Sequence, residues 1–422
     1  MAQGPILIFD KSALQCLNPD QAHWMDNFFM SNITPFFYIE TLADLEKEVK
    51  AGKTSEQVVG EIAAKSPDMQ AVPNVYHLTL IWAELTGQSE IKMVGFPIIA
   101  GGQPVTHEGA KGIIYKPSPE QEALSRWQQG EFLEVERGMA KIWRQQLESI
   151  DLKAMAASFK PIHEKAGSPQ SLEDIKTLAE AIIDGPDQEA VLRLGLELTI
   201  GYGDWGDQVF ARWKSLGQPP IRDFSPYLTY VLTVDLFFYL GMAASQIGSD
   251  RKSNKADIAY LYYLPFCMVF TSRDNLQIRI APLFLRNDQS FVHADDLKAD
   301  LKRLDEFYDA LPEDVKRKGV YSFAAYPPKD DSFLVTQLWN KHMKPPEGFV
   351  PSPSTHEGKT IYVPPAGSDP KVIIKALNDF EENAVPLDPD TPISPDEAAV
   401  VQFSKFILRK KGKWVRIPEE QE

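Results

Sequence analysis

Four acidic residues carry the chemistry that the sequence predicts most directly. Each stands just beyond a short apolar run or in the first turn of a predicted helix: Asp10, Glu40, Asp257 and Asp274. Four carboxylates in one pocket repel each other and raise one another's pKa unless a cation neutralises them. Mg²⁺ and Mn²⁺ prefer oxygen ligands and keep several waters, so they are suited to hydrolysis of a phosphate ester. We therefore expect the four acids to hold Mg²⁺ or Mn²⁺ for phosphodiester cleavage.

The elements that position the first two acids read as the start of a parallel sheet. Residues 5–9 (PILIF) and 34–39 (TPFFYI) are continuous apolar runs of the kind found in buried strands, and each ends on an acid. Helical spacing follows each run, over residues 12–30 and 41–49. This β-α-β-α order is typical of a parallel sheet, whose strands end at one crevice.

The same rhythm returns late in the chain, where it positions the other two acids. Asp257 stands in the first turn of a predicted helix that Asn254 is expected to cap, and Asp274 lies just beyond the strand FCMVFT. Both acids are thereby directed to the same crevice. The elements expected here are a helix over 257–264, a strand over 266–271, a further helix, a strand over 290–293 and a helix over 295–311.

A long stretch of different character separates these two parts. Residues 51–251 hold helical patterns, as over 120–150 and 188–198, and one predicted β-ribbon over 92–115 around a Gly-Gly turn. We expect residues 1–50 and 252–344 to form an α/β core and residues 51–251 to form a mostly helical insertion. The Pro-rich residues 345–422 are expected to be a C-terminal extension, with a basic strand-turn-strand pattern at 402–417. The insertion is expected to pack as one body beside the sheet and to shape access to the crevice, so that its removal leaves metal binding largely intact and alters selectivity.

These motifs resemble those of the PIN-like domain family. ILIFDKSAL resembles the family's first motif, FFYIETLADLEK its second, and NKADIAYLYYLPFCMVFTSRDNL its third and fourth. The resemblance covers residues 5–48 and 254–311, under a third of the chain. The long connection between Glu40 and Asp257 departs from the family pattern.

The resemblance implies a three-layer α/β/α core with a central parallel sheet, interrupted by the insertion. It also implies a metal-dependent nuclease that acts on nucleic acid, RNA above all, with Asp10, Glu40, Asp257 and Asp274 as metal ligands. Ser12 would hydrogen-bond a ligating carboxylate or a water. Asp44, one turn beyond Glu40, is expected to be a neighbouring acid rather than a fifth ligand. Some family members are toxins with antitoxin partners, and the sequence leaves such a partner and the choice of RNA or DNA open.

The sequence leaves two other functions to compare with a nuclease. A noncatalytic PIN-like module that binds RNA or protein is the alternative, and the presence of all four acids favours the enzyme. A haloacid-dehalogenase phosphatase also opens with a strand and an Asp, but Ser12 stands where its second Asp is needed.

Several shorter motifs predict ordinary structure. Residues 201–206 (GYGDWG) match a dinucleotide fingerprint but follow a predicted helix instead of a strand, and residues 52–54 (GKT) lack the earlier glycine of a phosphate loop. The seven histidines are scattered, which does not favour zinc. Trp127 and Trp143 fall on helical faces and are expected to pack in the core instead of stacking on bases.

The whole chain has the composition of a folded globular protein. It has 422 residues, 43% of them hydrophobic, and a net charge of −15, which disfavours long-range capture of nucleic acid. Two separated cysteines, Cys16 and Cys267, indicate a reducing compartment, and no basic region precedes the first apolar run, so we expect a cytoplasmic protein. The apolar stretch 227–244 carries Asp235 and is expected to be a buried helix with no role in a membrane.

Overall fold

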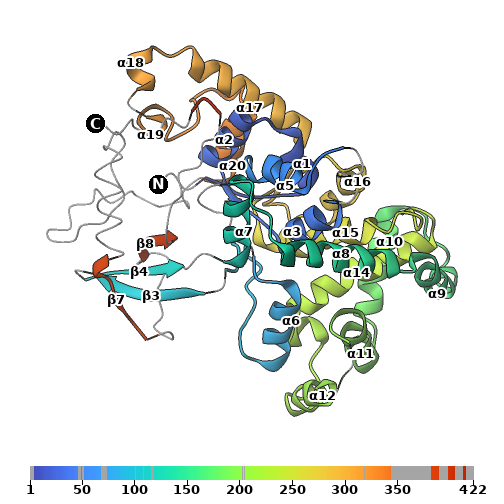
Figure 1. Ribbon diagram of the computed structural model, residues 1–422. Helices are drawn as coiled ribbons and strands as arrows, with labels where there is room; N and C mark the ends of the chain where they lie inside the picture. The colour runs from blue at the N-terminus through green and yellow to red at the C-terminus, as the bar shows by residue number, and fades with distance from the viewer. Residues whose placement is uncertain are drawn as a thin grey trace.

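The protein is a mixed α/β fold built around a parallel sheet of four strands (Figure 1). The structure is a computed structural model. It describes residues 4–343, apart from gaps at 46–48, 50–51, 68–73, 100, 108, 116–117, 202, 204 and 318, and in addition residues 382–388, 398–403 and 412–414.

The parallel sheet joins two parts of the chain that are far apart in sequence. Its strands run in the order β2 (Met30–Asn32), β1 (Ile6–Phe9), β5 (Val269–Ser272) and β6 (Ser290–His293). In the register of the central pair, Leu7 lies opposite Val269. The early and late segments therefore form one sheet, as the sequence predicts.

Both faces of this sheet are buried, which explains its continuous apolar strands. All four residues of β1 are buried, and they alternate between two hydrophobic clusters. Ile6 and Ile8 pack with the long helix α14 (Pro226–Ala243), whereas Leu7 and Phe9 pack with α2 (Pro19–Phe28).

The helices after β1 differ from the prediction. The single helix expected over 12–30 is two helices, α1 (Lys11–Cys16) and α2, because Asn18 forms a capping box that starts a new helix with Pro19 in its first turn. The strand expected over 34–39 is wrong. These residues begin α3 (Pro35–Ala43), and the short β2 before them supplies the strand.

The cause of that error is that a short apolar run is compatible with either structure. Residues 35–39 are apolar without interruption, so periodicity does not separate a strand from a buried helix, whereas a proline in the first turn is a helix start. The helix expected over 41–49 is misplaced for the same reason. Helix α3 ends at Ala43, and residues 46–48 lie outside the described residues.

The late elements follow the expected order with shifted bounds. In place of one helix over 257–264 there are α15 (Asn254–Ile258) and the 3₁₀ helix η1 (Ala259–Phe266), and β5 begins at Val269. The strand over 290–293 is confirmed. Helices α16 (Asn275–Phe284) and α17 (Ala294–Asp309) flank it.

The cap predicted for α15 is wrong. Ser253 occupies the N-cap position, and the amide of Asn254 instead donates to the carbonyl oxygen of Gly248 at 2.8 Å. Asp257 still lies in the first turn of α15, as expected.

The helices between residues 51 and 251 do not pack as one body. Helices α5 (Ser55–Ala63), α7 (Pro119–Gln128) and α8 (Glu134–Ser149) join the cluster that contains α2, whereas α6 (His77–Thr86) and α9 to α14 join the other cluster. The helix expected over 120–150 is thus two helices, while α11 (Gln188–Thr199) agrees with its prediction. The inserted stretch covers both faces of the sheet.

A second sheet contains the predicted β-ribbon. Strands β3 (Gly102–His107) and β4 (Ala110–Tyr115) are antiparallel. The last pair in their register is His107 with Ala110, so the strands do not turn at the predicted Gly-Gly pair. Strands β7 (Val385–Pro386) and β8 (Ala398–Phe403) complete it in the order β7-β3-β4-β8. The pattern predicted over 402–417 lies mostly outside the described residues.

Helix α14 is the one helix in the described part of the chain whose length and composition would allow it to cross a membrane. That is weak evidence of a membrane span, since 83% of it is buried inside the protein, as in a core helix. The buried helix predicted here is confirmed.

The remaining helices are α9 (Leu152–Lys165), α10 (Leu172–Ile183), α12 (Gly206–Ser215), α13 (Ile221–Phe224), α18 (Glu313–Lys316), α19 (Val320–Phe323) and α20 (Leu334–His342).

Candidate functional site

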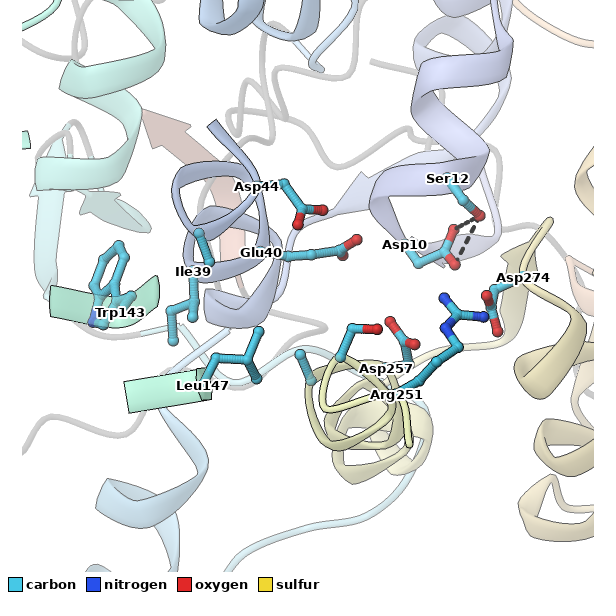
Figure 2. A pocket seen from close by; sticks show the side chains of 13 residues that line it. Asp10, Ser12, Ile39, Glu40, Asp44, Trp143, Leu147, Arg251, Asp257 and Asp274 are labelled. Atoms are coloured by element: carbon cyan, nitrogen blue, oxygen red, sulfur yellow. Dashed lines mark hydrogen bonds between the residues drawn. The ribbon is translucent and has the colours of Figure 1, made fainter. Parts of the chain in front are cut away.

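A pocket of about 130 Å³ lies beyond the carboxyl ends of β1 and β5 (Figure 2). Strand β1 pairs with β2 on one side and with β5 on the other, so this is where the strand order changes direction and a crevice forms. All four acids predicted from the sequence line the pocket: Asp10, Glu40, Asp257 and Asp274.

Asp10 follows β1 and is the best-anchored of the four. Its carboxylate accepts hydrogen bonds from the backbone N–H of Ala13 at 2.8 Å and from the hydroxyls of Ser12 and Ser272, the latter at 2.6 Å. It is the N-cap of α1. Burial raises the pKa of Asp10 from its ordinary value of 3.8 to about 6, although these hydrogen bonds favour the ionised form. The contact from Ser12 is the one that the family resemblance implies.

Asp274 is tied to Asp10 through one serine. Ser272, the last residue of β5, donates its hydroxyl proton to Asp10, and the same hydroxyl oxygen accepts the backbone N–H of Asp274 at 3.0 Å. The carboxylate of Asp274 caps α16, accepting from the N–H of Leu276 at 2.7 Å. The ends of the two central strands are therefore held at a fixed spacing.

Glu40 reaches the pocket from a helix instead of a strand end. It lies on α3, and its carboxylate accepts a hydrogen bond from the hydroxyl of Tyr260 in η1 at 2.7 Å. Burial raises the pKa of Glu40 from 4.5 to about 7, and the charge of Asp10 adds to this rise, while the nearby ammonium of Lys11 opposes it.

Asp257 is the acid whose surroundings satisfy it least. Its Oδ2 atom is buried and has no hydrogen-bond partner among the described residues. Burial and then the charges of Glu40 and Asp274 raise the pKa of Asp257 from 3.8 to about 8, with only the charge of Arg251 in opposition. A buried carboxylate oxygen without a partner costs free energy that a bound cation or donor would recover.

A buried ion pair fixes the helix that carries Asp257. The ammonium of Lys255 in α15 lies 2.5 Å from the carboxylate of Asp235 in α14 and 3.1 Å from the hydroxyl of Tyr262. The hydroxyl of Tyr262 also donates to Asp235 at 2.5 Å. This contact accounts for the acid in the middle of the apolar helix α14.

Asp44 lines the pocket but is neutralised by a neighbour. The ammonium of Lys11, which is almost fully buried, lies 2.8 Å from its carboxylate. The expectation that Asp44 is a neighbouring acid instead of a fifth ligand stays a prediction.

The acids share a pocket without forming a preassembled metal site. No three His, Cys, Asp or Glu side chains in the described parts of the chain form a group that could hold a metal ion as it stands.

Three further side chains line the pocket, of which the sequence analysis singled out only Trp143, as a residue expected to pack in the core. Arg251 precedes α15 and points in between Asp257 and Asp274, and Trp143 and Leu147 of α8 form an apolar wall at the other end (Figure 2). Trp127 is buried as predicted, whereas Trp143 is only partly buried. A helix at a distant position in the sequence gives no local signal that it borders a site.

Comparison of the chain with protein-family models, with curated proteins and with solved structures finds no match in any of the three.

Proposed function

We propose that the protein is a metal-dependent nuclease that hydrolyses phosphodiester bonds, with RNA as its expected substrate. The observation that carries this proposal is that four acids from four different elements line one pocket and that one of them, Asp257, keeps an unpartnered buried oxygen there. A carboxylate pocket of this kind is suited to Mg²⁺ or Mn²⁺, which take oxygen ligands.

The carboxylate oxygens that line the pocket are donors of the kind that a divalent cation takes, although they do not form a metal-binding group as they stand. Asp10, Glu40, Asp257 and Asp274 would hold it. Burial is the main cause of the raised pKa values of the first three, and a bound cation would favour their ionised forms. When bound, a divalent ion supplies positive charge that favours ionisation of water and stabilises the charge on phosphate oxygens.

The protein's own groups orient the reacting parts. Ser12 and Ser272 hold the Asp10 carboxylate in one position through hydrogen bonds of 2.8 and 2.6 Å, and Tyr260 does the same for Glu40. Carboxylates that are already held in place lose little conformational entropy when they bind a cation and a substrate. Their fixed positions favour a reaction geometry in line with the scissile bond.

The same proposal includes the finer fold assignment. A parallel sheet covered on both faces by helices supports a PIN-like three-layer α/β/α core. The order in which the acids occur along the chain supports it too. In this assignment, residues 51–251 are an addition to the PIN-like core, and they contribute Trp143, Leu147 and Arg251 to the pocket.

The decisive test is cleavage of a panel of single-stranded and duplex RNA and DNA, with Mg²⁺, with Mn²⁺ and with a chelator. We expect metal-dependent cleavage by the native chain and its loss on Asp10→Asn, Glu40→Gln, Asp257→Asn or Asp274→Asn. Asp295→Asn is the matched control, because this exposed acid pairs with Arg273 outside the pocket and should retain activity.

Full activity of Asp10→Asn with Mn²⁺ present would show that the chemistry lies elsewhere. Binding of RNA or protein without cleavage by the native chain would instead support a noncatalytic module.

A further inference from the structure

A short segment near the C-terminus lies against the core outside the acidic pocket. Residues 412–414 (Gly-Lys-Trp) contact helices α2 and α17, which lie side by side (Figure 1). The segment belongs to a stretch, residues 402–418, that holds six basic residues and no acid. The proposed nuclease chemistry makes no use of this stretch.

Trp414 is held between aromatic side chains and is only 9% exposed. The centroid of its ring lies 4.8 Å from that of Trp24, at an interplanar angle of 65°, and 6.3 Å from that of Phe323. Its indole N–H donates to the carboxylate of Asp305 at 2.5 Å. A buried ring whose one polar atom is also satisfied is a typical anchor in peptide recognition.

Lys413 is held by carboxylates. Its ammonium lies 3.1 Å from the carboxylate of Asp305 and 3.0 Å from that of Asp309. Its backbone N–H donates to the side chain of Asp20 at 2.8 Å. Ion pairs of this exposure contribute little affinity each, but they set the orientation of the segment and select a basic residue beside the tryptophan.

Gly412 lets the backbone turn at the edge of this site. Its φ of +56° lies in the left-handed region, where a residue with a side chain is strained. A Cβ atom at this position would overlap the carboxylate of Asp20, which accepts the N–H of Lys413. Three adjacent residues of the segment therefore each meet a separate feature of the core.

The core holds this site in shape through contacts of its own. Trp24 stacks on Tyr308 with ring centroids 4.5 Å apart, and its indole N–H donates to Asp305 at 3.1 Å. A site that is already formed loses little conformational entropy when its ligand binds. We call the residues that form or support it the aromatic slot: Trp24, Asp305, Tyr308 and Phe323.

We propose that the aromatic slot is a peptide-binding site for Gly-Lys-Trp segments, occupied here by the chain's own residues 412–414. The slot recognises such a segment whether or not the two are joined in one chain. Because β8 lies earlier in the same extension and pairs with β4, the occupied slot ties the second sheet to the helices of the first. This inference does not rest on the proposed nuclease function.

The test is binding of a fluorescein-labelled peptide of residues 408–418 to the full chain carrying Trp414→Ala, followed by anisotropy. That variant keeps the slot but removes the anchor of its own segment. A peptide in which alanine replaces the tryptophan has the same charge and should bind at least roughly 10-fold more weakly. This control separates recognition from attraction of a basic peptide to an acidic protein.

The native chain should bind the same peptide more weakly than Trp414→Ala does, because its own segment competes. A tethered segment at an effective concentration of about 1 mM weakens roughly 10-fold a free peptide that binds at about 0.1 mM. In the Trp414→Ala chain, adding Asp305→Ala should also weaken binding. Glu306→Ala is the matched control, since it removes a neighbouring carboxylate of α17 that pairs with Lys302 at 3.7 Å.

Urea unfolding confirms that each variant is folded. The peptide variants decide the question even if Asp305→Ala does not fold, because they leave the core unaltered. Equal binding of the two peptides, equal binding to the native and Trp414→Ala chains, or no binding up to about 2 mM peptide would overturn the inference.

Discussion

At the scale of single residues, the pocket is held in an electrostatically unfavourable state. Asp10, Glu40 and Asp257 all have raised pKa values, chiefly because they are buried, at about 6, 7 and 8. Each folded carboxyl keeps its proton at pH values where the unfolded chain, with pKa values of 3.8 to 4.5, has already lost it. The unfolded state then binds fewer protons, so the free energy of unfolding decreases as pH rises.

We therefore predict that the melting temperature of the metal-free protein falls between about pH 4 and pH 8. Mn²⁺ should raise it, and by more at pH 8 than at pH 5, because the cation binds the ionised acids and stabilises the native state. Differential scanning calorimetry with chelator or Mn²⁺ measures both curves. A metal-free melting temperature that rises across this range would contradict the prediction.

Asp10 allows its two roles to be separated. Asn caps a helix about as well as Asp, so Asp10→Asn should fold normally and, without metal at pH 8, be equal to or slightly more stable than the native chain. Asp10→Ala also loses the cap of α1 and should cost about 1 kcal/mol relative to Asp10→Asn. Urea unfolding of both variants, with chelator present, measures the difference. Equal stability would show that the cap contributes nothing.

The sequence predicts a pocket residue only where the residues next to it form a recognisable pattern. Asp10 and Asp274 are identifiable because an acid directly follows, or nearly follows, an apolar run. Ser272 holds Asp10 and Tyr260 holds Glu40 through contacts between residues more than 200 positions apart, which no local pattern reports. The place of Arg251 in the pocket is not predicted from the sequence for the same reason, and Trp143 was expected to lie in the core. Glu40 lines the same pocket as the other three acids, as expected, but it lies on a helix where the sequence predicts the end of a strand.

At the scale of elements, the ion pair of Lys11 and Asp44 joins the start of α1 to the end of α3 beneath the pocket. Lys11 is almost fully buried, so Asp44→Asn leaves a buried ammonium without its partner. We predict a loss of at most about 3 kcal/mol, the low end for a broken buried pair, because the charge of Glu40 still interacts with Lys11.

The double variant Lys11→Met with Asp44→Asn should recover part of that loss, since no unpaired ammonium remains. A double-mutant cycle followed by urea unfolding gives the coupling energy. Additive effects of the two substitutions would show that the pair is not coupled.

The element predictions fail where packing decides between two structures that the sequence allows equally. Residues 35–39 fill a helix whose face lies against the sheet, and the actual strand, β2, has only three residues, too few for an alternating pattern. By contrast, β6 and α11 have clear boundaries in the sequence and appear almost where predicted.

At the scale of the whole molecule, the stretch from 51 to 251 is part of the core. It supplies helices to both hydrophobic clusters, and α14 is buried along most of its length. We now predict that replacing residues 51–251 with a short linker gives a chain that does not fold, because both faces of the sheet would be exposed to water. This replaces the expectation that metal binding would survive the deletion.

Circular dichroism and urea unfolding test that prediction. The matched control removes only residues 101–116, the β3–β4 ribbon, whose buried residue Val105 belongs to neither cluster, and it should leave cooperative unfolding intact. A cooperatively folded chain without residues 51–251 would show instead that the divided core is independent.

The pairing of β1 with β5 also sets when the site comes into being. The ribosome extends the chain from its N-terminus, and Ser272, the partner of Asp10, is made 262 positions later. Until then Asp10 and Glu40 have neither Asp257 nor Asp274 beside them, and the central strand of the sheet lacks its neighbour. The pocket therefore cannot form during most of translation, and the nuclease activity proposed above would be absent from the nascent chain until these late segments have been made.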